Sequence, residues 1–157
     1  MTTTTQPVSV PTAAPPPWFN SMMASLLRTP GLQHWIGKAI ALITVTGRRT
    51  GKTYTTPVSY YRDGNTVIVL TKKFRNWWRN LLDNPEVELL LEGRKFRGRA
   101  RPSVGDPADL PAFIRFLENR RLDAKAYGVT FTPEGRVNRD EARRVLSEIV
   151  LVRITLD

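Results

Sequence analysis

The chain has 157 residues, of which 41% are hydrophobic, and a formal net charge of +10 at pH 7. That length suits one compact domain with a single core. The absence of cysteine and the presence of one histidine, His34, exclude disulfides, thiolate or multi-histidine metal sites, and a Ser/His/Asp triad built elsewhere in the fold. Any catalysis therefore depends on a cofactor or on tyrosine, serine, lysine and carboxylate groups, and no metal site is expected.

The positive charge is concentrated in one part of the chain. Residues 28–101 hold fifteen basic and five acidic side chains, residues 102–157 hold nine of each, and residues 1–27 hold none. A concentrated basic field attracts an anion, so the expected partners are a phosphorylated cofactor, nucleic acid or an acidic membrane surface.

The N-terminal segment is uncharged. Residues 1–17 are rich in Thr, Pro and Ala and are expected to form a disordered lead-in, followed by one domain over residues 18–157. Apolar residues at helical spacing predict helices over residues 18–27 and 32–38. Because no basic residue precedes the first apolar stretch and no run is long enough to span a bilayer, a cytoplasmic protein is expected. The first helix is interpreted as a core element or active-site lid, with peripheral contact on the inner face of the plasma membrane as the alternative.

Short apolar or alternating runs predict antiparallel strands joined by hairpins. The expected strands cover residues 39–46, 53–62, 66–70, 87–91, 95–101 and 149–156. Helical spacing predicts helices over residues 76–82, 109–121 and 138–146. This order indicates an α+β fold, a small antiparallel barrel capped by helices, rather than a doubly wound parallel sheet.

The turn between the first two strands, TGRRTGKT at residues 46–53, is close to a Walker phosphate loop. Its glycines are separated by three residues where the Walker pattern has four, and a β-branched run follows that predicts a strand instead of the required helix. The Walker interpretation is therefore rejected. Arg48, Arg49 and Lys52 nevertheless place three cations on a glycine-flanked turn, which suits an anion site. An ordinary solvated hairpin turn is the alternative.

Three motifs follow one another in a specific order. They are the turn G-R-x-[ST]-G-[KR] from residue 47, the strand motif T-x-P from residue 55 and the helix motif W-[WY]-x-N-L from residue 77. In this combination the chain resembles the deazaflavin-dependent nitroreductase family over roughly residues 19–156. The resemblance implies a split β-barrel that binds coenzyme F420, a deazaflavin with a phosphate and an acidic oligoglutamate tail, in a groove beside the barrel.

The resemblance also assigns cofactor-binding residues. It places the phosphate on the turn and the deazaflavin ring along the following strand, which gives Arg48, Arg49, Thr50, Gly51, Lys52, Tyr54, Thr55, Thr56, Pro57 and Val58. The acidic tail is a candidate ligand for a basic strand face, for which a face that is basic for solubility alone is the alternative. That face consists of Lys95, Arg97, Arg99 and Arg101.

One loop departs from the family pattern. Better-known members have a small-residue loop, S-K-G-G and later P-x-W-[WY], after the third strand, whereas this chain runs directly from Thr71 through Asn76 into two tryptophans. The cofactor-binding residues assigned here are Thr71, Lys72, Lys73 and Arg75. The shorter loop leaves FMN, a fatty acid or an apolar quinone-like molecule as alternative ligands.

Three further side chains complete the expected site. Adjacent helix positions point about 100° apart, so one of Trp77 and Trp78 is expected in the core and the other, assigned as Trp78, beside the cofactor. Asn80 is assigned to the cofactor or to a loop cap, with a solvent-facing residue as the alternative. By the same resemblance Tyr127, in the loop after the amphipathic helix, is the candidate catalytic proton donor or substrate contact, and a tyrosine packed beneath a loop is its alternative.

Three hypotheses for the function follow. The first is an F420-dependent oxidoreductase, monomer or homodimer, that reduces a small hydrophobic electron-poor acceptor such as a quinone, an enone or a nitro compound. The second is a non-catalytic, FMN-binding or lipid-binding protein of the same fold, associated with a membrane. Nucleic-acid binding ranks last, because the one aromatic residue of the basic strand, Phe96, is expected to point inward, and no specific nucleic-acid partner is expected.

Overall fold

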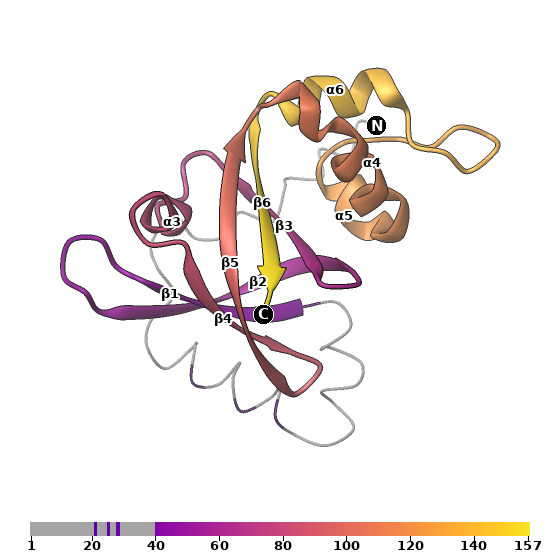
Figure 1. The fold of residues 1–157 in the computed structure, drawn as a ribbon. Coiled ribbons are helices and arrows are strands. Elements are labelled where there is room, and N and C mark those ends of the chain that lie inside the picture. The colour runs from indigo at the N-terminus through magenta and orange to yellow at the C-terminus, as the bar shows by residue number, and fades with distance from the viewer. Residues whose placement is uncertain (1–20, 22–24, 26–27, 29–39) are drawn as a thin grey trace.

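The computed structural model describes Ser21, Ser25, Arg28 and residues 40–157 (Figure 1). Those three isolated N-terminal positions are helical. The expected lead-in over residues 1–17, the second short helix and the rest of the first helix lie outside the described residues.

The described chain forms a closed antiparallel barrel of six strands in the order β1-β2-β3-β6-β5-β4, with β4 returning to β1. The strands are β1 (Ile40–Thr46), β2 (Thr53–Asp63), β3 (Thr66–Lys72), β4 (Glu86–Leu91), β5 (Arg94–Val104) and β6 (Ile149–Leu156). All six expected strands are present, and every pairing is antiparallel. The predicted fold class is confirmed.

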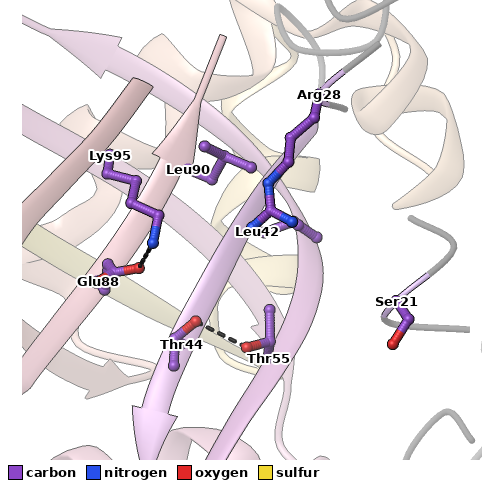
Figure 2. A pocket seen from close by; sticks show the side chains of 8 residues that line it. All are labelled: Ser21, Arg28, Leu42, Thr44, Thr55, Glu88, Leu90 and Lys95. Carbon is purple, nitrogen blue, oxygen red and sulfur yellow. Dashed lines mark hydrogen bonds and ion pairs between the residues drawn. The ribbon is translucent and has the colours of Figure 1, made fainter. Parts of the chain in front are cut away.

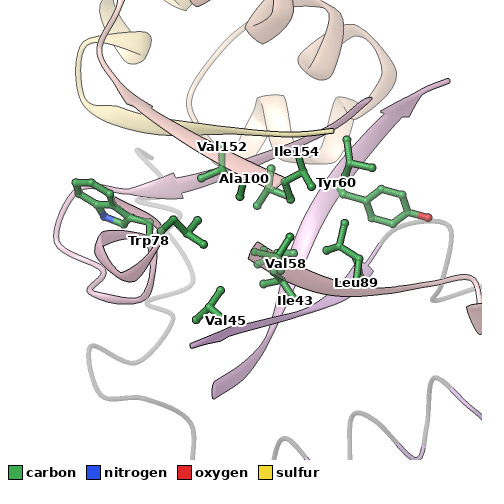
Figure 3. Packing of buried hydrophobic residues seen from close by; sticks show 14 of the residues in the cluster. Ile43, Val45, Val58, Tyr60, Trp78, Leu89, Ala100, Val152 and Ile154 are labelled. Carbon is green, nitrogen blue, oxygen red and sulfur yellow. The ribbon is translucent and has the colours of Figure 1, made fainter. Parts of the chain in front are cut away.

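Alternation along the strands fills the barrel. On β5 the four basic side chains point to solvent while Gly98 and Ala100 point inward, as the sequence predicted. Side chains of the same inward series from all six strands form one apolar cluster, with Trp78 at one end and Tyr60 at the other (Figure 3). Closure gives each of the six strands a paired neighbour on both sides.

Strands β3 and β6 are buried on both faces, which explains why they read as continuous apolar runs. Their outer faces support a second cluster with helices α4 (Leu110–Asn119), α5 (Arg121–Ala126) and α6 (Arg139–Leu146). Phe113 and Phe116 of α4 are fully buried there. Figure 1 shows these three helices together on one side, whereas α3 (Asn80–Asp83) and the β1–β2 turn lie on the opposite side of the barrel.

Two predicted element boundaries are wrong. The helix expected over residues 109–121 is preceded by the 3₁₀ turn η2 (Pro107–Asp109) and breaks at Arg120, whose φ of −130° and ψ of 66° are not helical. Arg120 then pairs with Asp123 at 2.9 Å, and α5 follows. The helix expected over residues 76–82 is the 3₁₀ turn η1 (Trp77–Arg79) continued by α3. Tyr127 consequently caps α5 instead of lying in a long loop.

The connection between α5 and α6 is held by one carboxylate. The Glu141 side chain accepts hydrogen bonds from the backbone N–H and the hydroxyl of Thr130, both at 2.7 Å. These two bonds lower the pKa of Glu141. A folded-state pKa below the unfolded value means that the ionised group contributes stability above the unfolded pKa and loses it as pH falls through the folded pKa.

Glu141→Gln is therefore expected to lower the melting temperature at pH 7, by an amount that shrinks as the pH is lowered toward 3. Thermal unfolding of both proteins across that range measures the difference. Glu134→Gln, at an exposed position in the same connection, serves as the control. A deficit that stayed constant down to pH 3 would show that the charge of Glu141 contributes nothing.

Candidate functional site

The turn between β1 and β2 is tight and internally bonded. Gly47 N–H donates to the Lys52 carbonyl at 2.7 Å, and Gly51 N–H donates to the Gly47 carbonyl at 2.9 Å. Gly51 has a φ of 68°, a left-handed conformation that favours glycine. A Cβ added to Gly47 would lie 2.6 Å from the Tyr54 ring. The chain leaves the turn as a strand, which confirms that it is not a Walker loop.

This turn is fixed to α3. The backbone N–H of Arg48 donates to Asn80 Oδ1 at 3.1 Å, across 32 residues of sequence. Arg48 and Asn80, which belong to different sequence motifs of the expected site, are therefore in contact. With its oxygen turned to Arg48, Asn80 acts as the loop cap that the sequence analysis allowed.

The short segment after β3 is anchored by its neighbours. Arg75 N–H donates to the Lys72 carbonyl at 3.0 Å, and the Trp78 indole N–H donates to the Lys73 carbonyl at 3.4 Å. Arg79 donates to the Arg75 carbonyl at 3.0 Å and to Asn76 Oδ1 at 2.8 Å. Arg79 was missed by sequence reasoning, although its charge within the W-W-R-N-L motif was the available signal.

The burial of the two tryptophans is the reverse of the burial that the sequence predicted. Trp78 is 7% exposed and belongs to the barrel cluster, whereas Trp77 is half-buried and packs against that cluster. The Arg79 guanidinium lies 4.8 Å from the centre of the Trp78 ring. Trp78 is thus a core residue that also holds the loop, and its contact with a cofactor stays a prediction.

Side chains of the strand assigned to the cofactor ring do not share one face. Val58 points into the barrel core, and Tyr54 belongs to the same inward series but is exposed beyond the end of the core. Thr56 is half-buried in that series. Thr55 and Pro57 lie on the outer face, where the Thr55 hydroxyl bonds to Thr44 at 2.8 Å. A flat ligand along β2 can therefore meet only part of this set through side chains.

Positive charge near the turn and loop lacks acidic partners. Within residues 40–157 no ion pair involves Arg48, Arg49, Lys52, Lys72, Lys73, Arg75 or Arg79. The chain has no acidic residue before Asp63. By contrast, Lys95 and Arg99 on β5 pair with glutamates of β4 at 3.3 Å and 3.8 Å. Seven cations without an ion pair thus lie on the two segments joined through η1 and α3, although within residues 40–157 Arg97 and Arg101 of β5 also have no ion pair.

Tyr127 lies at the end of α5 and packs against the helix-side cluster. Its ring meets Phe113 edge to face, with the centroids 6.5 Å apart, and its backbone N–H donates to the Asp123 carbonyl at 2.9 Å. Burial, reinforced by the negative charge of Asp123 and opposed by Arg75, raises the pKa of Tyr127 to about 12. The hydroxyl therefore stays protonated at neutral pH.

A pocket of about 350 Å³ lies on the outer face of the barrel wall (Figure 2). Leu42 and Leu90 lie opposite each other across β1 and β4, and Lys95 pairs with Glu88 at the rim. The remaining lining residues are Ser21, Arg28, Thr44 and Thr55. Thr55 belongs to the expected cofactor site, and Lys95 belongs to the basic strand face considered for the acidic tail. This pocket contains none of the turn cations.

Two further findings concern only the part of the chain that the structure describes. No group of three or more His, Cys, Asp or Glu side chains there is arranged to hold a metal ion. No helix there has the length and apolar character needed to cross a bilayer.

The six-strand barrel with helices against one wall defines the split β-barrel class. Similar solved structures include the conserved protein Rv2991 of Mycobacterium tuberculosis, with a TM-score of 0.54 and 19% identity over 87% of this chain and 79% of that one. The heme storage protein HutZ of Vibrio cholerae has a TM-score of 0.54 and 13% identity over 83% and 90% of the two chains. A candidate pyridoxamine 5′-phosphate oxidase from Listeria innocua has a TM-score of 0.51 and 16% identity over 88% and 94%. At these identities the likeness shows the fold alone.

The family profile of the F420H(2)-dependent quinone reductases matches residues 22–130, and the chain belongs to this family. The F420H(2)-dependent quinone reductase Rv1261c of Mycobacterium tuberculosis is 32% identical over 66 residues. That match spans 39% of this chain and 44% of the relative, less than half the length of either. The resemblance to a deazaflavin-dependent reductase family is confirmed.

Proposed function

We propose that this protein is a reductase that uses reduced coenzyme F420 to reduce a small, hydrophobic quinone. The observation that carries the proposal is the exposed, acid-free cation cluster of Arg48, Arg49 and Lys52 on a turn whose backbone is fixed by Asn80. Family membership supports F420 as the ligand and a quinone as the acceptor. Enones and nitro compounds share the planar, electron-poor character of a quinone and are secondary acceptors in this proposal.

The residues present fit an anionic cofactor. Guanidinium groups bind phosphate through two parallel hydrogen bonds, and the tight turn presents its cations outward to solvent. Lys72, Lys73 and Arg75 add positive charge from the loop, where an acidic tail also finds partners. FMN carries a phosphate but no such tail, so the excess of cations favours F420.

The chain's own part in the reaction is orientation and proton supply. The chemistry that reduced F420 would supply when bound is transfer of a hydride. A quinone that has received a hydride needs one proton on its oxygen to become the quinol. The protonated Tyr127 hydroxyl is the proposed donor of that proton, and its packing on Phe113 holds it in place.

Titration of the purified protein with F420 and with FMN, followed by fluorescence, tests the cofactor. We expect submicromolar affinity for F420 and much weaker affinity for FMN. Oxidation of reduced F420 in the presence of 2-methyl-1,4-naphthoquinone then tests the reaction. Failure to bind either flavin would contradict the proposal and favour a non-catalytic, ligand-binding protein of the same fold.

Tyr127→Phe is expected to lower kcat for quinone reduction by about 100-fold, because it removes only the proton donor. The affinity for F420 should stay unchanged. The pKa of Tyr127 is raised to about 12, so its hydroxyl stays protonated up to pH 10. In the native protein, kcat should therefore not fall between pH 6 and pH 10 through ionisation of Tyr127. Steady-state rates from pH 6 to pH 10 measure both effects. An unchanged kcat would show that Tyr127 is only a packing residue.

A further inference from the structure

Arg79 is a cation whose guanidinium forms bonds inside the protein. Its Nη1 donates to the Arg75 carbonyl at 3.0 Å and to Asn76 Oδ1 at 2.8 Å. The same guanidinium lies 4.8 Å from the centre of the Trp78 ring, which is buried in the barrel core. A guanidinium is attracted to an aromatic face and is planar, so contact with a fixed ring limits its movement. Arg79 therefore ties the backbone at residues 75–76 to the core.

The bonds from Arg79 hold the end of a short loop that is crowded with positive charge. The loop, residues 72–76, contains Lys72, Lys73 and Arg75 and has no glycine. None of these three cations has an ion pair within residues 40–157. Like charges that lie close together repel one another. The two bonds from Arg79 oppose that repulsion and keep the 72–76 loop closed before any anion binds.

Arg79 and its neighbour Asn80 hold two different cation-bearing segments. Asn80 Oδ1 accepts a hydrogen bond from the backbone N–H of Arg48 at 3.1 Å, which fixes the β1–β2 turn. Two consecutive residues at the junction of η1 and α3 thus set the turn and the 72–76 loop relative to each other. A ligand with two anionic groups binds most tightly when its two sites are held at a separation that it can span.

We infer that Arg79 is a positioning residue for the acidic tail of the cofactor. It holds the 72–76 loop so that the cations of this loop meet the tail while the β1–β2 turn holds the phosphate. The inference rests on the proposed function and deepens it, because it names the residue through which the loop favours a cofactor with a tail over one without. Arg79 acts through the loop backbone that it bonds, and the loop cations contact the ligand.

Fluorescence titration with F420 and with its tail-less form, which keeps the phosphate, tests this inference. Native protein should bind F420 more tightly than the tail-less form. Arg79→Ala should weaken F420 binding about three- to tenfold, the effect of about one net hydrogen bond, and leave the affinity for the tail-less form within about twofold. Arg79→Lys keeps the charge but loses the planar fork, so it should behave like Arg79→Ala. Asn80→Ala should weaken both ligands, because it releases the phosphate-binding turn.

Arg62 provides a matched control. Its guanidinium lies 4.7 Å from the centre of the Phe96 ring, and its Nε donates to the Gly64 carbonyl at 2.9 Å. It therefore also joins an aromatic ring to a backbone carbonyl, but near the end of β2 farther from the β1–β2 turn. Arg62→Ala removes the same charge and a similar bond, and should change the affinity for neither ligand. Thermal unfolding of both alanine variants checks that the titrated protein is folded.

The outcomes separate this inference from the proposed function. If native protein binds F420 no more tightly than the tail-less form, or if Arg79→Ala leaves that preference unchanged, the inference is wrong and the proposed function stands. If Arg79→Lys retains a preference that Arg79→Ala loses, the charge of Arg79 meets the tail directly and the positioning role is wrong. If native protein binds neither form, the proposed function itself fails.

Discussion

Arg49→Ala and Lys52→Ala should each weaken F420 binding by about 10- to 100-fold. A hydrogen bond to a charged group contributes about 1.5–3 kcal/mol. Neither Arg49 nor Lys52 has an ion pair within residues 40–157, so no such pair is broken when F420 binds. The effect should shrink as salt concentration rises, since exposed charges are screened. Fluorescence titration at two ionic strengths measures both results.

A matched cation elsewhere provides the control for this prediction. Arg143 lies on α6 and is paired with Asp140, and Arg143→Ala should leave F420 affinity unchanged. Thermal unfolding of all variants should be nearly the same, because both turn side chains are exposed. If Arg143→Ala lowered the affinity for F420 as much as the turn variants do, F420 binding would depend on the net charge of the protein and not on Arg49 and Lys52.

Trp78→Ala should destabilise the fold by about 3–5 kcal/mol, the usual cost of emptying a large aromatic site in a core. The ring closes one end of the barrel cluster (Figure 3), and its N–H holds the Lys73 carbonyl. Urea denaturation at equilibrium measures the difference. Because the loop loses an anchor with the ring, F420 affinity should fall as well.

Two further variants separate packing from anchoring. Trp78→Phe keeps most of the apolar ring and removes the N–H, so it should cost much less stability. Trp77→Ala, at the half-buried neighbour, should be milder than Trp78→Ala. A larger loss from Trp77→Ala than from Trp78→Ala would contradict the assignment of Trp78 as the core residue.

The barrel was predictable because its signals are local. Alternation along β5 and the apolar runs of β3 and β6 depend on side-chain period and burial. The break at Arg120 was not predictable, since no glycine or proline marks it in the sequence. It is stabilised by the pairing of Arg120 with Asp123, and a charged pair three residues apart also suits an unbroken helix.

The segments that make up the candidate site were predictable from the sequence, but the contacts between those segments were not. The cations of the turn were found from glycine spacing and charge. The exposure of Trp77 and Trp78 was assigned in reverse, because adjacent positions on a short helix differ only in orientation. The link between Arg48 and Asn80 spans 32 residues, and no local pattern indicates which way an amide side chain will point.

The bonded turn has a thermodynamic consequence for ligand binding. The N–H groups of Gly47, Arg48 and Gly51 are bonded within the turn or to Asn80 before any ligand arrives. An arriving phosphate therefore orders only the ends of a few side chains, and the backbone entropy of the turn was already lost when the chain folded. Most of the ordering cost then falls on the ligand and its flexible tail, so affinity should depend more on how the ligand is built than on how this loop moves.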